Sequence, residues 1–240
     1  MAVAFDAVGP SAAGAYLTTN AVSWSHTNSA AGNAIVVSFS FPGASTSSVT
    51  AVSYGAAALT RIGQQSFGQG GTDVWGKVGG LPTGANTVTV TGMTNASTTT
   101  GVAGGSTSYT AAVSFGTAFV AAVNSTSISV NVTGTTAGGM ICASDTFGSN
   151  VTPTPSTGGT LRVNAQGDSG SGADNCFIGT WVSPGGTQAV GFSTASADNH
   201  QIVAVELLPS GAAAALLPQQ VRHRAPQAAP YRPGLATYIR

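Results

Sequence analysis

The chain has 240 residues, of which only 6% are charged and 42% are hydrophobic. No apolar run approaches the roughly 18 residues of a membrane-spanning helix, so we expect no membrane partner. The net charge is zero, but residues 1–208 hold three bases and seven acids, whereas residues 209–240 hold four arginines and no acid. So few bases beside an acidic body argue against nucleic-acid binding and favour an acidic protein surface as the partner.

The first sixteen residues contain neither the basic segment nor the continuous apolar segment of a secretory signal. We therefore expect the protein to be made and assembled in the cytoplasm, which for a virion protein is that of the host cell. The uncharged, Ser/Thr-rich composition is typical of a durable exterior protein, and the two expectations together favour a virion component. Cys142 and Cys176 are too few for a disulfide framework and are predicted to be small buried core residues, with a bridge between neighbouring strands left open.

Apolar residues alternate with polar ones along most of the chain, which predicts half-buried antiparallel strands. In residues 35–41, Ile35, Val37, Phe39 and Phe41 are expected to share one face. Glycine and proline turns separate the predicted strands. These strands are residues 21–26, 35–41, 49–54, 58–62, 72–78, 87–91, 109–115, 118–123, 127–132, 139–144, 160–164, 176–182, 187–193 and 201–208.

Residues 109–115 follow the same alternation, so Tyr109, Ala111, Val113 and Phe115 are predicted to share a face. No helical periodicity occurs before residue 210. The predicted fold class is therefore all-β: an antiparallel, jelly-roll-like β-sandwich with at least ten strands and no helix longer than about two turns.

The sandwich domain is predicted to span residues 1–208 and to be followed by an extended C-terminal arm, residues 209–240. Five of the eleven prolines fall in this arm, which rules out a central strand or a long helix. Its basic and apolar side chains are expected to bind a partner surface. The residues expected to make that contact are Arg222, Arg224, Tyr231, Arg232, Leu235, Tyr238, Ile239 and Arg240.

Four segments together carry a family resemblance: SVTAVSYGAAALTRIG, TDVWGKVGGLPTGANTVTVT, YTAAVSF and HQIVAVELLP. Within residues 30–208 this pattern resembles a jelly-roll module of tailed-phage virion proteins and related bacterial surface proteins. The resemblance implies a capsid decoration or minor capsid protein. Its partners would be the major capsid protein, another virion protein or copies of itself, and it brings no catalytic residue and no cofactor.

A serine hydrolase is a remote alternative. The sequence Gly167-Asp168-Ser169-Gly170 resembles the segment around the nucleophile of chymotrypsin-like proteases, and His26, Asp73 and Ser169 follow that family's order. The residues after Gly170 and around His26 depart from the family pattern. We therefore predict a polar turn, no catalysis at Ser169, and a protein that is not an enzyme.

Other candidates were a calcium site formed by Asp168, Ser171 and Asp174, and a carbohydrate- or receptor-binding module of a phage tail or cell surface. Two aspartates are weak support for calcium. Sugar binding would need exposed tryptophans, whereas Trp24, Trp75 and Trp181 lie in strand patterns and are predicted to be core residues. Glu206, in the last strand, is predicted to be exposed at the rim or paired with an arginine.

Overall fold

The computed structural model describes residues 1–11, 13–42, 47–68, 70–94, 101–167 and 175–211. Within these ranges the chain forms sixteen strands and no helix, which confirms the all-β prediction. The predicted arm, from residue 212 onward, lies outside the described residues.

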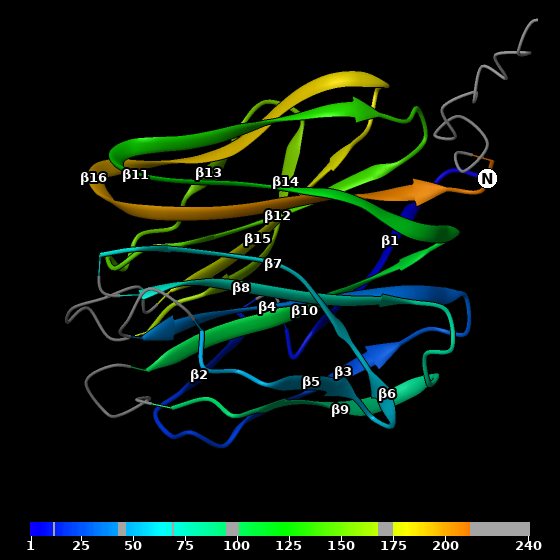
Figure 1. Ribbon diagram of the computed structural model, residues 1–240, viewed down its shortest axis with the longest axis horizontal. Coiled ribbons are helices and arrows are strands. Elements are labelled where there is room, and N and C mark those ends of the chain that lie inside the picture. The colour runs from blue at the N-terminus through cyan, green and yellow to red at the C-terminus, as the bar shows by residue number, and fades with distance from the viewer. Residues whose placement is uncertain (12, 43–46, 69, 95–100, 168–174, 212–240) are drawn as a thin grey trace, which may run out of the picture.

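The strands form three antiparallel sheets stacked as layers (Figure 1). The middle sheet has the order β1 (Ala4–Gly9), β10 (Val102–Thr110), β4 (Gly32–Pro42), β8 (Gly70–Val78) and β7 (Thr60–Phe67), with β2 (Ala15–Leu17) also on β10. The upper sheet has the order β11 (Ala112–Thr135), β16 (Gly186–Pro209), β12 (Met140–Thr146), β15 (Cys176–Val182) and β14 (Gly159–Ala165), with β13 (Thr154–Pro155) on β16. The lower sheet has the order β3 (Val22–Asn28), β9 (Gly84–Thr91), β5 (Ala51–Tyr54) and β6 (Ala57–Ala58).

The middle sheet is covered on both faces, so sandwich-type packing occurs twice. Strand β4 shows this directly: Ile35, Val37 and Phe39 pack with Trp24 and other residues of the lower sheet, as the alternation predicted. Ala34 and Val36, on the opposite face, belong to the core shared with the upper sheet. Two hydrophobic cores therefore depend on the same six-stranded middle sheet.

A third core lies on the outer face of the upper sheet. Strands β11 and β16 each have 24 residues and pair as one long antiparallel ladder. The distal half of this β11–β16 ladder curves back over the sheet (Figure 1). Ile128 and Phe192, from the returning half, pack with Phe147, Phe177 and Trp181 beneath them. The β11–β16 ladder thus supplies both an edge of the upper sheet and its cover.

Two predicted strand breaks are wrong. The sequence indicated separate strands at 118–123 and 127–132, and again at 187–193 and 201–208, because polar residues lie between them. In the structure each pair is one continuous strand, and the ladder changes register between Ser125 and Ser127. A bulge of this kind bends a strand without ending its pairing.

The prediction that residues 109–115 form one strand face is also wrong. Ala111 has a φ of 60°, in the left-handed region that non-glycine residues seldom adopt, and the chain crosses there from the middle to the upper sheet. Tyr109 ends up in β10 and Phe115 in β11, where both contact the same core from opposite sheets. Val113 is exposed.

Candidate functional site

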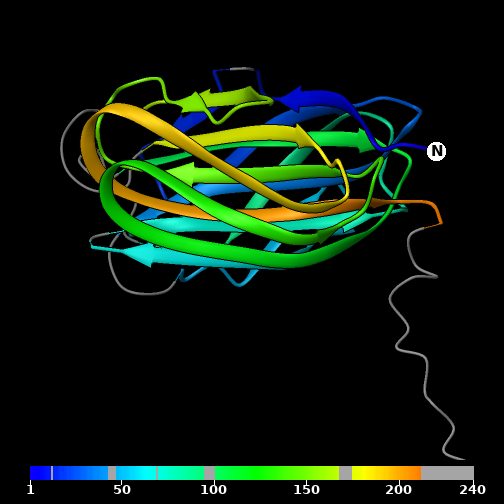
Figure 2. The same cartoon turned by 90° about the horizontal axis from the view of Figure 1, so that it is seen from above.

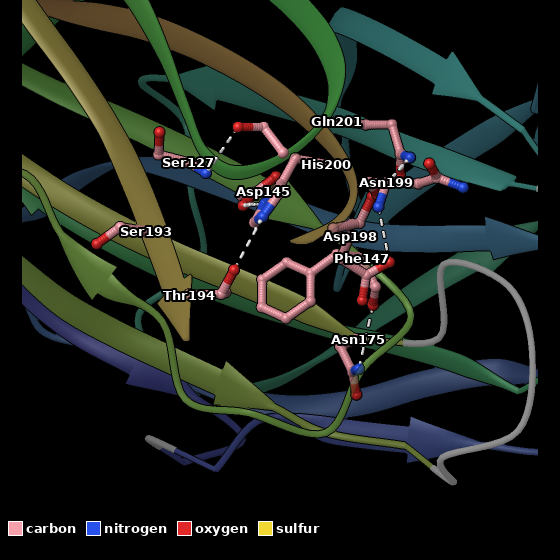
Figure 3. A network of polar contacts seen from close by, with 12 residues as sticks. Ser127, Asp145, Phe147, Asn175, Ser193, Thr194, Asp198, Asn199, His200 and Gln201 are labelled. Atoms are coloured by element: carbon pink, nitrogen blue, oxygen red, sulfur yellow. Dashed lines mark hydrogen bonds and ion pairs between the residues drawn. The ribbon is translucent and has the colours of Figure 1, made fainter. Parts of the chain in front are cut away.

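The most concentrated polar site described lies beneath the bend of the β11–β16 ladder (Figure 3). His200 Nδ1 is 2.7 Å from Asp145 Oδ2, and neither side chain has exposed surface. On the other side of the ring, His200 Nε2 is 3.3 Å from Thr194 Oγ1. A hydroxyl, an imidazole and a carboxylate therefore form one chain of contacts.

Neighbouring strands bring these groups together. Asp145 lies near the end of β12, where it pairs with Ile202 of β16, two residues beyond His200. The His200 ring is 4.7 Å from the ring of Phe147, which in turn stacks on Phe177 at 4.5 Å. The imidazole is thus held between an aromatic stack and a carboxylate in a site without water access.

Burial raises the pKa of Asp145 to about 6, and the hydrogen bond and positive charge of His200 act in the opposite direction. Thr194 Oγ1 lies 2.8 Å from the carbonyl oxygen of Ser196, closer than it lies to His200. This distance favours donation of the hydroxyl proton to Ser196. The roles of the two ring nitrogens depend on the tautomer of His200, and the geometry favours the one in which Nδ1 carries the hydrogen that the Asp145 carboxylate accepts.

The order hydroxyl, imidazole, carboxylate is that of a nucleophile, its base and an orienting acid. Two observations argue against this chemistry here. The imidazole is completely buried, and the Thr194 hydroxyl is engaged with a carbonyl. A substrate cannot reach this imidazole, so the geometry favours a structural role, in which the buried His200–Asp145 contact links β16 to β12.

Of the three residues of the alternative triad, the structure describes His26 and Asp73, and each has another partner. His26 Nδ1 is 2.9 Å from Ser106 Oγ, and burial lowers the pKa of His26 to about 4, so the ring is neutral near pH 7. The Asp73 carboxylate is bound by Arg61, with Nε–Oδ1 at 3.0 Å. Ser169 lies outside the described residues, as do the calcium candidates Asp168, Ser171 and Asp174.

The tryptophans and cysteines lie in the cores, as predicted. Trp75 and Trp181 are 6% and 1% exposed, so neither is available to stack on a sugar. Trp24 donates to Ser106 Oγ and is buried as well. Cys142 and Cys176 are buried free thiols, and burial raises the pKa of each to about 11.

The prediction for Glu206 is wrong. Its side chain is buried, at 4% exposure, and among the described residues it forms no ion pair with an arginine. Instead its carboxylate accepts the backbone N–H of Thr136 at 2.8 Å. A Cβ at Gly139 would stand 2.4 Å from Glu206 Oε1, which shows how tightly the turn between β11 and β12 wraps this side chain.

Replacing Glu206 with alanine should lower the free energy of unfolding by about 1–3 kcal/mol, because the Thr136 N–H loses its charged acceptor in a buried turn. Chemical denaturation followed by fluorescence measures this. Glu206→Gln is the matched control: its side-chain oxygen still accepts the same N–H, so it should retain most of the stability. Equal losses in both variants would contradict this role for the hydrogen bond.

No group of three metal-ligating side chains occurs in the described part of the chain, and no helix there is long and apolar enough to cross a membrane. The predicted partner-binding residues of the arm, Arg222 to Arg240, lie outside the described residues. Comparisons with family models, curated proteins and solved structures give no match for this chain.

Proposed function

We propose that this protein is a structural virion component, a capsid decoration or minor capsid protein. The layered body would lie on the particle, and the C-terminal arm would attach it to the capsid or to a neighbouring subunit. This proposal combines the family resemblance of the sequence with the way the body uses its charged groups.

The observation that carries the proposal is that every carboxylate of the described body is bonded within the fold. Asp73 is bound by Arg61 and Asp145 by His200. Asp6 accepts from Ser108 Oγ at 2.7 Å, Asp198 accepts from the backbone N–H of Ser149 at 2.7 Å, and Glu206 accepts from Thr136. Acids held in this way stabilise sheets and turns, which supports a structural role over a catalytic one.

The distribution of the basic residues supports attachment through the arm. Four of the seven basic residues lie in residues 209–240, beyond the last ladder pair of the upper sheet, Ala112 with Pro209. Basic groups on an extended segment steer it toward an acidic surface and set its register there. Apolar anchors such as Tyr231 and Leu235 would add binding by burial.

Replacing Arg222, Arg224, Arg232 and Arg240 with glutamine should reduce incorporation into particles by at least about tenfold at low salt, because complementary charge governs this kind of association. Co-production with the candidate capsid protein, followed by quantification of purified particles, measures the occupancy. The matched control replaces the same four residues with lysine, which keeps the charge. Wild-type occupancy of the glutamine variant would overturn the proposed attachment.

A further inference from the structure

One strand edge of the body is unusually open to pairing. Strand β11 pairs with β16 on one side, and no described strand pairs with its other side. The ladder is regular from Ala118, opposite Val205, to Ser125, opposite Asp198, a run of eight residues. Val120 and Val123 in this run are 46% and 37% exposed.

Most of the other edge strands carry protection that this one lacks. Strand β1 has Asp6 and a bulge, β7 has Arg61 and a bulge, and β14 has Arg162 and a bulge. Strand β6 has two residues. Strand β3 has no bulge and no acid, lysine or arginine, but its exposed side chains are serine and threonine, whereas the run in β11 exposes valines. Charges, bulges and short length are the usual means of preventing edge-to-edge association. Residues 112–125 contain no charged residue and no proline, and the bulges of β11 fall outside the run 118–125.

The position of the chain's exit identifies a partner for this edge. The last ladder pair, Ala112 with Pro209, shows that the chain leaves the body next to the start of β11. In Figure 2 the end of β16, in orange, lies at one end of the body. A segment of the same molecule turning back from there would run parallel to β11. All described ladders are antiparallel, and antiparallel pairing is slightly more stable per residue. A second copy can approach in that direction.

The end of the arm has a suitable length and pattern. The last proline is Pro233, so residues 234–240 form a seven-residue segment in which every backbone N–H can pair. In an extended conformation Leu235 and Ile239 would share one face and Tyr238 and Arg240 the other. These seven residues are enough to pair along most of the eight-residue regular edge, and the arginine complements an acidic body.

We propose that residues 118–125 of β11 form the docking site for residues 234–240 of a second copy of this chain, which adds there as an antiparallel strand. Main-chain hydrogen bonds provide the affinity in this mode of recognition, and alternate side chains provide the specificity. The inference rests on the proposed binding role of the arm but does not require a capsid.

Disulfide trapping between two full-length variants tests the proposal. Val120→Cys is mixed with Ile239→Cys under mild oxidation, and the mixed dimer is quantified on a non-reducing gel. Docking should raise its rate of formation at least about tenfold, because pairing raises the effective concentration of the thiols. The matched control pairs Ile239→Cys with Val182→Cys, since Val182 is a 68% exposed valine on another strand. The buried native thiols, with pKa values of about 11, should not react.

Equal rates with Val120→Cys and Val182→Cys would overturn the proposal. So would preferential dimerisation of Val120→Cys with itself, which would indicate that two β11 edges pair directly.

A second experiment measures the molecular mass of the full chain in solution. Val120→Lys should shift it toward monomer and Val182→Lys should not, with both variants melting as the wild type does. A wild-type chain that is monomeric at high concentration would also overturn the proposal. Trapping without particle incorporation would contradict only the proposed capsid role.

Discussion

Replacing Asp145 with alanine should lower the free energy of unfolding by about 3 kcal/mol, the upper end of the usual cost of leaving a buried donor without its acceptor, because neither side chain has exposed surface. The His200 ring would keep its contact with Phe147, but its Nδ1–H would lose its acceptor 2.7 Å away. Equilibrium denaturation of the purified variant measures the loss.

Asp145→Asn is the matched control for this site. Its amide oxygen can still accept from His200 Nδ1, so the hydrogen bond persists while the negative charge is removed. We expect a smaller loss than with alanine. A gain in stability from the alanine change would contradict the structural assignment, because strained functional sites commonly become more stable when their polar groups are removed.

The second large expected effect is a loss of stability at low pH, caused by protonation of His26. Its pKa is about 4 in the folded protein and about 6.5 when unfolded, so the unfolded chain binds the proton more readily. The stability contributed by the neutral ring is fully present above about pH 6.5 and is lost as the pH falls toward 4. The difference corresponds to about 3 kcal/mol.

His26→Asn isolates this contribution. Asparagine can retain the bond to Ser106 but does not titrate, so the wild type should lose about 3 kcal/mol relative to the variant between pH 7 and pH 4. Unfolding free energies of both proteins across that range provide the measurement. A constant difference between them would show that His26 is not held neutral in the fold.

Asp145 should change the free energy of unfolding in the opposite direction to His26 over part of the same pH range. Its folded pKa of about 6 lies above its ordinary value of 3.8, so its contribution is present at low pH and is lost as the pH rises toward 6. The wild-type stability should therefore vary less with pH than that of either single variant. Comparing His26→Asn with Asp145→Asn separates the two slopes.

The sequence was sufficient to predict those parts of the fold in which apolar and polar residues alternate along a strand. Ile35, Val37, Phe39 and Phe41 share a face as expected, because a period of two follows from strand geometry alone. It was insufficient where backbone conformation interrupts the pattern. Ala111 redirects the chain through a left-handed conformation that no neighbouring glycine or proline signals.

The polar site was not predictable in the same way. Asp145 and His200 are 55 residues apart and meet only because β12 and β16 pair in one register. The only sequence signal was that each lies at the end of an apolar strand pattern, a position shared by many surface residues. Glu206 was misjudged for a related reason: its partner is a backbone N–H in a turn, which residue types do not reveal.

The place of β16 in the upper sheet has a consequence during synthesis. This last strand of the body pairs with β11, β12 and β13, so the sheet cannot close until the chain through Pro209 has left the ribosome. Until then the apolar residues of β11 and β12 lack their central neighbour. Pairings so distant in sequence form slowly, and nascent chains of this protein should therefore depend on chaperones late in translation, when most of the body has already emerged.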